Sequence, residues 1–228
     1  MFQRPIAQLL VYYFHRYKAY ASDPGVQGEQ TPGRICLRLA LNNAFSRLAL
    51  PPLDNSDTFV TAEGGKPYLL RSGEDKFFGF NMSVSGDHLA VGVTDYGSIG
   101  VDIEARSIPR KKTSLEAVMI YYFQDDERLF VLDASQDEEE FLWRFLRIWT
   151  RKEAAVKCQG KSIGSHGMLV NGMEDYWIDE ESGTSVAIQD VSFPGAPRLQ
   201  ASVALQSGAL QSGGSPRPMI IDGDDLRL

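Results

Sequence analysis

Two short segments of this chain carry acidic and basic side chains at spacings that could build a metal and phosphate site. The first, residues 99–104, reads Ile-Gly-Val-Asp-Ile-Glu and alternates with a period of two. In a strand, Asp102 and Glu104 would share one face, with their carboxylates roughly 7 Å apart from the rise of about 3.3 Å per residue. Carboxylate oxygens are ligands that Mg²⁺ prefers, and its sites usually leave room for a substrate phosphate. Taken alone, the pair is more typical of an edge strand with a solvated acidic face.

The second segment, residues 149–157, reads Trp-Thr-Arg-Lys-Glu-Ala-Ala-Val-Lys. Glu153 and Lys157 are four residues apart, so in a helix they point the same way, and Trp149 shares their face. One interpretation is a third carboxylate for the metal, with lysines, Lys152 included, placed to bind phosphate. The other is an exposed Glu–Lys pair beside a core tryptophan.

Two further segments contain residues that can approach a phosphate. Residues 80–87 read Phe-Asn-Met-Ser-Val-Ser-Gly-Asp, a strand pattern that runs into a tight turn and brings the hydroxyls of Ser83 and Ser85 beside it. Residues 65–68, Gly-Lys-Pro-Tyr, read as a turn that contains Lys66. Many hairpins carry such residues for structural reasons, so neither segment identifies a site by itself.

The helix that must carry Glu153 is the strongest secondary-structure signal in the chain. Residues 137–158 contain no Gly or Pro, begin with four acidic residues and carry basic residues late, a distribution that complements the helix dipole. Gly160 follows where a C-terminal cap belongs. Further helices are predicted over 34–50 and 114–123.

The strand that must carry Asp102 is one of several predicted by alternation and turn residues. These strands cover 58–62, 66–70, 77–85, 89–94, 99–104, 177–178, 185–188 and 199–205, and 206–218 is a predicted loop. One group of strands follows the first helix, and another follows the later helices, instead of single strands and helices alternating. This order predicts an α+β fold.

The charge balance argues against partners that need a basic surface. The 228 residues carry 23 Lys and Arg against 30 Asp and Glu, a net charge of −7, so a long-range field for nucleic acid is absent. No apolar run reaches the length of about 18 residues that a membrane span needs. The apolar stretch 6–14 has the outline of a signal peptide, but Gln8 within it and basic residues after it favour a buried strand or short helix.

Cysteine and histidine offer no alternative metal site in the sequence. Cys36 and Cys158 are far apart and lie in predicted helices, so we interpret them as buried, reduced thiols of a cytoplasmic protein. The three histidines are scattered and form no zinc-binding pattern.

Together and in this order, the chemical segments resemble the larger, surfactin-synthetase-activating branch of the 4′-phosphopantetheinyl transferases. That family shows a GKP segment, an FNxSHSG-like segment, a G-[IV]-D-[IL]-E strand and a W-x-x-KE-[AS]-x-x-K helix. Here they stand as Gly65–Pro67, Phe80–Gly86, Gly100–Glu104 and Trp149–Lys157. The resemblance covers about residues 31–165 in motifs; each motif is weak alone, and the ordered set is specific.

The resemblance implies a fold of two similar α+β halves in a pseudo-twofold arrangement, here residues 1–105 and 106–228, with coenzyme A in the cleft between them. It implies a Mg²⁺-dependent enzyme that moves the phosphopantetheine arm of coenzyme A to a serine of an acyl or peptidyl carrier protein. Such a protein is expected to be a cytoplasmic monomer.

The resemblance also implies roles for residues of this sequence. Asp102, Glu104 and Glu153 would hold Mg²⁺ together with the coenzyme A pyrophosphate, and Glu153 would help, through water, to deprotonate the carrier serine. The remaining expected contacts are Lys157 and Lys152 on the phosphates, and Lys66, Ser83 and Ser85 lining the nucleotide site.

At one position the sequence departs from the family pattern. The family segment has His where this chain has Val84, and valine can neither donate a hydrogen bond nor carry charge. Two alternatives therefore stay open: a family member that binds coenzyme A or a carrier without efficient transfer, and another Mg²⁺-dependent phosphoryl enzyme.

The sequence also offers a candidate surface for an acidic carrier protein. Residues 110–112, Arg-Lys-Lys, are followed by Met119, Ile120 and Tyr121. The alternative is a solvated loop followed by an ordinary core helix.

Overall fold

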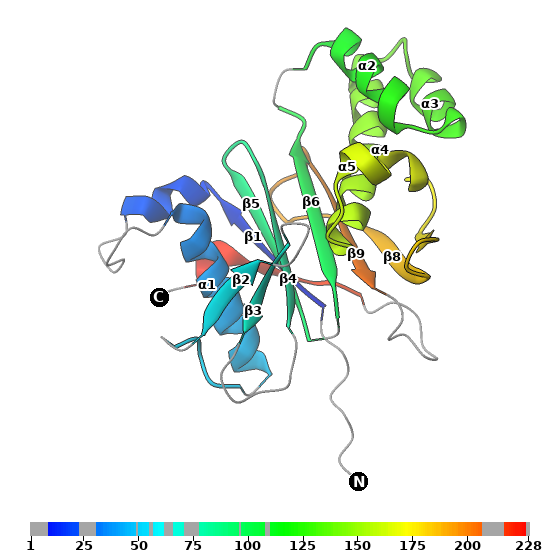
Figure 1. Ribbon diagram of the computed structural model, residues 1–228. Coiled ribbons are helices and arrows are strands. Elements are labelled where there is room, and N and C mark those ends of the chain that lie inside the picture. Colours follow the sequence, from blue (N-terminus) through cyan, green and yellow to red (C-terminus); the bar gives the residue numbers. More distant parts are fainter. Residues whose placement is uncertain are drawn as a thin grey trace.

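The computed structural model describes residues 9–22, 31–48, 50–54, 57–61, 66–70, 78–95, 97–107, 110–206 and 217–226. Two four-stranded sheets form its centre, and a long helix flanks each of them (Figure 1). Strands and helices are grouped in the chain and do not alternate regularly, so the predicted α+β class is confirmed.

The first sheet has the strand order β10-β1-β5-β4. Its strands are β10 (Met219–Asp222), β1 (Leu9–His15), β5 (His88–Thr94) and β4 (Gly79–Ser85). β1 runs parallel to β10, and the other neighbours are antiparallel. Helix α1 (Pro32–Arg47) packs on one face, because its apolar side chains share a buried cluster with Leu10, Tyr12 and Phe14 of β1. The described part of the apolar stretch, from Leu9 on, is thus a buried strand, as one of our two interpretations held.

The second sheet has the strand order β6-β9-β8-β7 and is antiparallel throughout. Its strands are β6 (Ile99–Ala105), β9 (Leu199–Gln206), β8 (Thr184–Val191) and β7 (Tyr176–Asp179). Helix α4 (Glu138–Cys158) covers one face, where Ala154, Ala155 and Val156 are fully buried. The predicted C-terminal cap is present, because Gly160 has a φ of +69°. The N-terminal end also has a cap, which was not predicted: the Asp137 carboxylate accepts hydrogen bonds from the N–H groups of Glu139 and Glu140.

The two sheets share a core, because alternate residues of each strand point in opposite directions. Leu9, Val11 and Tyr13 of β1 pack in one cluster with Ile99, Val101 and Ile103 of β6 and with residues of β9. The order of layers is therefore α1, first sheet, second sheet, α4. This leaves the opposite face of β6 directed toward α4.

The remaining elements surround this centre. A hairpin of β2 (Thr58–Thr61) and β3 (Pro67–Leu70) has the predicted strands, and its predicted turn lies outside the described residues. Helices α2 (Lys112–Tyr122) and α3 (Asp125–Leu132) lie near the start of α4 (Figure 1). Short elements complete the chain: α5 (Ile163–His166), η1 (Tyr17–Ser22), η2 (Gly167–Leu169) and η3 (Gly223–Asp225).

The sequence prediction missed several elements. Helix α3, strand β10 and the short elements α5, η2 and η3 were not predicted, and α1 ends at Arg47, before the expected end at Leu50. Most of the predicted loop 206–218 lies outside the described residues. Both cysteines are buried and free, as predicted. Among the described residues, no helix combines the length and apolar character that crossing a membrane requires.

Helix α4 and the second sheet come into close backbone contact at Gly100 of β6. A Cβ atom there would lie 1.9 Å from the carbonyl oxygen of Ala154 and 2.5 Å from the amide nitrogen of Cys158. Both are helix backbone atoms, so neither can move aside without moving α4. Glycine at position 100 therefore sets the separation between the helix and the strand that carries Asp102.

We predict that Gly100→Ala destabilises the fold by about 1–3 kcal/mol or more, because overpacking against backbone cannot be relieved by a side-chain rotation. Urea unfolding measures this loss. Gly164→Ala is the matched control, since its Cβ would meet nothing closer than the Ser162 hydroxyl at 3.9 Å; we expect a change of about 0.5 kcal/mol or less there. Equal effects of the two substitutions would refute the importance of the Gly100 contact.

Candidate functional site

Strand β6 presents its two acidic residues toward α4, as its alternation predicts. Ile99, Val101 and Ile103 lie in the core between the sheets, so Asp102 and Glu104 point the other way. Asp102 is buried, with 4% of its surface exposed, and Glu104 is half-buried. The strand is held in this register by its antiparallel pairing with β9, where Asp102 lies opposite Ser202.

Helix α4 brings Glu153 and Lys157 onto these carboxylates. The Lys157 ammonium lies 2.6 Å from Asp102 Oδ1 and 3.7 Å from Glu153 Oε2. Glu104 is close enough to act electrostatically on both Glu153 and Lys157. The structure thus gathers four of the predicted site residues, from segments about fifty residues apart in the sequence.

The electrostatics of this cluster favour proton and cation binding. Burial raises the pKa of Asp102 to about 7; Lys157 and Ser83 oppose that rise, and Glu153 adds to it. Burial also raises the pKa of Glu153, with a further contribution from Glu104. Burial lowers the pKa of Lys157, but Asp102, Glu153 and Glu104 together outweigh it and leave that pKa raised. Three acidic groups around one ammonium therefore form a site that gains from additional positive charge.

The donor set suits a hard divalent cation. Asp102 Oδ2 is buried and has no hydrogen-bond partner within the described part of the chain. Lys157 contacts Asp102 Oδ1, and Arg110 forms an ion pair with Glu104 Oε2. Among the described residues no three His, Cys, Asp or Glu side chains are close enough to form a metal site as they stand. Carboxylate oxygens, one of them without a partner, are nevertheless ligands of the type that Mg²⁺ takes.

Lys152, expected to contact phosphate, is not at this site, and that prediction is wrong. Its side chain is fully buried on another face of α4 and forms an ion pair of 2.8 Å with Glu127 of α3. Its ammonium also donates to the carbonyl oxygens of Gly167 and Val170. The physical reason is the helix period: adjacent residues are about 100° apart, so Lys152 and Glu153 cannot serve the same face.

Lys66 is also occupied by the protein. Its ammonium donates to the carbonyl oxygens of Ile99 at 2.9 Å and Cys158 at 2.7 Å, and to the Ser98 hydroxyl. It therefore joins the start of β6 to the end of α4, where our prediction had it lining the nucleotide site. The predicted contact of this ammonium with a nucleotide is not supported by its geometry.

The hydroxyls of Ser83 and Ser85 are near the site but are directed at its carboxylates. Ser83 Oγ donates to Asp102 Oδ1 and Ser85 Oγ donates to Glu104 Oε2, each at 2.9 Å. Val84, between them in sequence, is on the other face of β4 with 45% of its surface exposed.

Only some of the candidate docking residues are exposed and available to a partner. Arg110 is engaged with Glu104, and Met119 is buried in the core beneath α2. Lys111, Lys112, Ile120 and Tyr121 are exposed, but the Lys112 ammonium donates to the Ser135 carbonyl oxygen and lies over the Phe141 ring. The expectation of one continuous docking patch over residues 110–112 and 119–121 is therefore reduced to Lys111, Ile120 and Tyr121, whose side chains are exposed and not engaged in this way.

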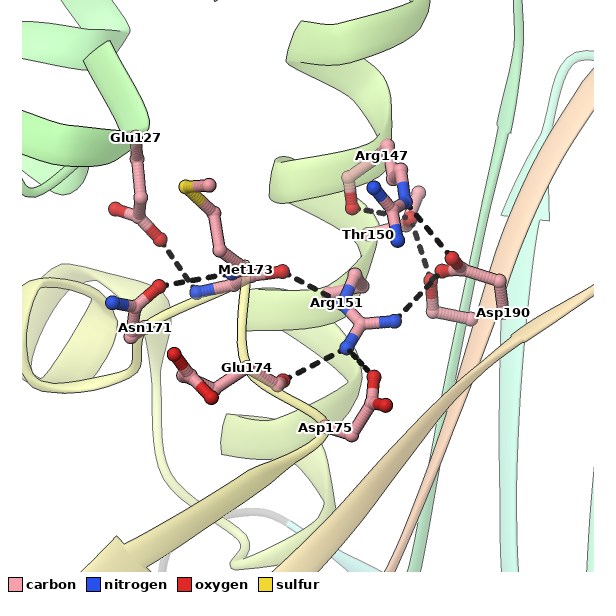
Figure 2. Close-up of polar contacts among 11 residues, drawn as sticks. Glu127, Arg147, Thr150, Arg151, Asn171, Met173, Glu174, Asp175 and Asp190 are labelled. Atoms are coloured by element: carbon pink, nitrogen blue, oxygen red, sulfur yellow. Dashed lines mark hydrogen bonds and ion pairs between the residues drawn. The ribbon is translucent and has the colours of Figure 1, made fainter. Parts of the chain in front are cut away.

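Sequence reasoning missed the residue that fixes α4 from its other side, Arg151. The guanidinium is 1% exposed and bonds to the carbonyl oxygens of Gly172 and Glu174 and to the carboxylate of Asp175 (Figure 2). It also pairs at 3.2 Å with Asp190 of β8. The available signal was the run of polar residues 150–152. Adjacent residues of a helix are about 100° apart, so a helix packed on a sheet cannot expose all three, and at least one must be buried with polar partners.

A cavity of about 380 Å³ adjoins the cluster through Arg110. Its lining includes four basic side chains, Arg106, Arg110, Lys112 and Arg198, together with Glu138 and Glu139. Arg106 Nε is buried and has no hydrogen-bond partner among the described residues. The neighbourhood of the carboxylates thus offers positive charge to an anionic group.

Comparison with known proteins agrees with the motifs at the level of the superfamily. Residues 98–205 match the family model described as the 4′-phosphopantetheinyl transferase superfamily. The chain is 32% identical over 139 residues to the 4′-phosphopantetheinyl transferase AcpT of Escherichia coli (strain K12), covering 61% of this chain and 66% of that protein. It is 36% identical over 136 residues to AcpT of Salmonella typhimurium, covering 60% of this chain and 62% of that protein.

A fungal relative gives a shorter match. The 4′-phosphopantetheinyl transferase pptA of Paxillus involutus is 33% identical over 118 residues, which cover 47% of this chain and 45% of that protein. The chain thus matches between about half and two thirds of the length of these relatives. The matched family segment contains β6 and α4, and with them Asp102, Glu104, Glu153 and Lys157. Residues 98–205 of this chain are therefore similar to the 4′-phosphopantetheinyl transferase superfamily.

Proposed function

We propose that this protein transfers the 4′-phosphopantetheine arm of coenzyme A to a serine of an acyl or peptidyl carrier protein, with Mg²⁺ as cofactor. The observation that carries the proposal is the contact of Lys157 with both Asp102 and Glu153, at 2.6 and 3.7 Å, inside the segment that matches the superfamily. Acidic and basic groups of this kind are needed where a pyrophosphate is bound and cleaved.

Each residue of the cluster has a proposed role. Asp102, Glu104 and Glu153 would hold Mg²⁺, which when bound would neutralise charge on the pyrophosphate and orient it. The hydroxyl oxygen of the carrier serine would attack the phosphorus that bears pantetheine, and Glu153 would accept the proton of that hydroxyl through water. The bond from that phosphorus to the 3′,5′-ADP oxygen breaks. Lys157 would then stabilise the negative charge on the leaving group.

We further propose that the chain represents the larger branch of the superfamily, with halves over residues 1–105 and 106–228. Two sheets that each pack against one long helix support this division. The two proposed halves exchange strands. Strand β6 belongs to residues 1–105 but pairs within the second sheet, and β10 belongs to residues 106–228 but pairs within the first. A monomer in the cytoplasm is the form we propose for the enzyme.

The carrier protein is proposed to dock beside α2. Lys111, Ile120 and Tyr121 offer one positive and two apolar side chains to it, and Arg106 and Arg198 lie at the neighbouring cavity. An acidic partner would complement these groups locally although the net charge of the chain is −7.

Intact-mass measurement of apo carrier proteins, incubated with this protein, coenzyme A and Mg²⁺, tests the activity. We expect a gain equal to the mass of one phosphopantetheine arm, lost when the metal is chelated. Glu153→Gln should slow transfer by about 100-fold or more, because it removes the proton acceptor and a carboxylate ligand. Glu180→Gln, the same change at an exposed position of the turn between β7 and β8, is the control and should leave the rate unchanged. No gain on any carrier in a broad panel would contradict the proposed activity.

A second candidate function is binding of coenzyme A or a carrier without efficient transfer, and Val84 is the observation that favours it. We predict that Val84→His raises kcat/KM for coenzyme A by about tenfold, the worth of one hydrogen bond to a charged group. Met82→His is the matched control, since Met82 is on the same exposed face of β4. Equal effects at both positions would show that position 84 has no special role in ligand contact.

The raised pKa of Asp102 predicts how the metal-free protein responds to pH. Its pKa rises from the ordinary 3.8 to about 7 in the folded state, so the folded protein holds this proton where the unfolded chain has released it. Stability should therefore fall as the pH rises from about 4 to about 7 and level off above that, by an amount on the order of a few kcal/mol. Urea unfolding in the presence of a chelator, at several pH values, measures the slope.

Asp102→Asn separates this contribution from other carboxylates. Asparagine does not titrate, so the wild type should lose unfolding free energy relative to the variant as the pH rises from about 4 to about 7. A difference that does not depend on pH between 4 and 8 would contradict the raised pKa.

A further inference from the structure

Strands β4 and β6 are the end strands of different sheets, yet they lie side by side. They are joined by side chains of β4 and not by a backbone ladder. Asn81 Oδ1 accepts a hydrogen bond of 2.9 Å from the Val101 N–H, and Ser83 Oγ accepts one of 3.3 Å from the Ile103 N–H. Ser85 Oγ completes the series, accepting from the Ala105 N–H at 3.0 Å. These three side chains satisfy the outward N–H groups of an edge strand.

The two serines do something that Asn81 does not. Each hydroxyl also donates its proton to the carboxylate that precedes its N–H partner: Ser83 to Asp102 and Ser85 to Glu104, both at 2.9 Å. A hydroxyl has one proton to donate. While it is given to a carboxylate, it is not available to a bound phosphate.

The contacts also select which carboxylate oxygens remain available. Asp102 Oδ1 accepts from Ser83 and contacts Lys157, so Oδ2 is the oxygen left without a protein partner. Glu104 Oε2 accepts from Ser85 and pairs with Arg110. Strand pairing fixes the backbone of Asp102 and Glu104 but leaves their side-chain torsions free. Contacts to the side chains themselves, such as the serine hydrogen bonds, are needed to fix the carboxylate planes.

We infer that Ser83 and Ser85 are positioning residues: they orient Asp102 and Glu104 for a divalent cation and register the first sheet against the second. The part that concerns the cation rests on the proposed function. The part that concerns the carboxylates stands on the hydrogen bonds alone. Asn81 belongs to the same ladder without touching a carboxylate and is the natural control.

The first test measures binding of Mn²⁺, a paramagnetic probe for the Mg²⁺ site, by water proton relaxation. Ser83→Ala and Ser85→Ala should each weaken binding by about 10–100-fold, the usual effect of losing a group that orients a metal ligand. Ser83→Thr keeps the hydroxyl and should recover most of the affinity. Asn81→Ala also removes one contact to β6, and it should lower the melting temperature while leaving Mn²⁺ affinity within about twofold of wild type.

The second test needs no metal. A double-mutant cycle of Ser83→Ala with Asp102→Ala, followed by urea unfolding in chelator, should be non-additive by on the order of fivefold in the unfolding constant. The cycle of Asn81→Ala with Asp102→Ala should be additive, because those side chains share no hydrogen bond.

These results separate the inference from the proposed function. If wild type binds no Mn²⁺, the metal part of the proposed function fails, and the cycle still decides whether Ser83 holds Asp102. An additive Ser83–Asp102 cycle overturns the inference, whatever the cation result. Serine variants that bind Mn²⁺ as tightly as wild type overturn the cation part of it while leaving the proposed activity intact.

Discussion

The close approach of α4 to β6 at Gly100 is the constraint on which the rest of this structure depends. With Ala154 and Cys158 backbone atoms within 2.5 Å of where a Cβ would be, any larger residue would lift the helix from the strand. Glu153 and Lys157 lie one residue before and three residues after Ala154 on that helix. Their distance from Asp102 is therefore set by the same contact. A strand carrying two acids and a helix carrying an acid and a lysine become one site only because no side chain separates them.

That contact is reinforced on the other faces of α4 by polar groups that take no part in the cluster. Arg151 ties the helix to the segment 172–175 and to Asp190, and Lys152 ties it to Glu127 and to two carbonyl groups (Figure 2 shows the Arg151 side). Burying such charges is expensive unless they are fully paired, and a hydrophobic replacement can be equally stable. A buried ion pair does, however, orient the helix. Its charged groups meet only when the helix has one particular rotation about its axis and one position along it. We interpret these contacts as fixing the rotation of α4, and Gly100 as fixing its distance.

The sequence predicted those parts of the site that depend on local periodicity. Alternation in β6 placed Asp102 and Glu104 on one face, and the four-residue spacing in α4 placed Glu153 and Lys157 on another; the structure joins them. It could not predict Lys152 or Lys66 correctly, because whether a lysine meets a ligand or a carbonyl group depends on segments distant in sequence, here Glu127 for one and Ile99 with Cys158 for the other. For the same reason β10 was missed: four residues become a strand only through their parallel pairing with β1, at the other end of the chain.

Strand β4 shows how the two faces of one short segment can have different environments. Its inward residues, Asn81, Ser83 and Ser85, are bonded to β6, so their side chains are constrained by the joint between the sheets. Its outward residues, Met82 and Val84, are exposed and contribute little to that joint. Because side chains alternate across a strand, a change at position 84 alters the outer surface without disturbing the carboxylates. The valine found there is therefore compatible with an intact acidic cluster.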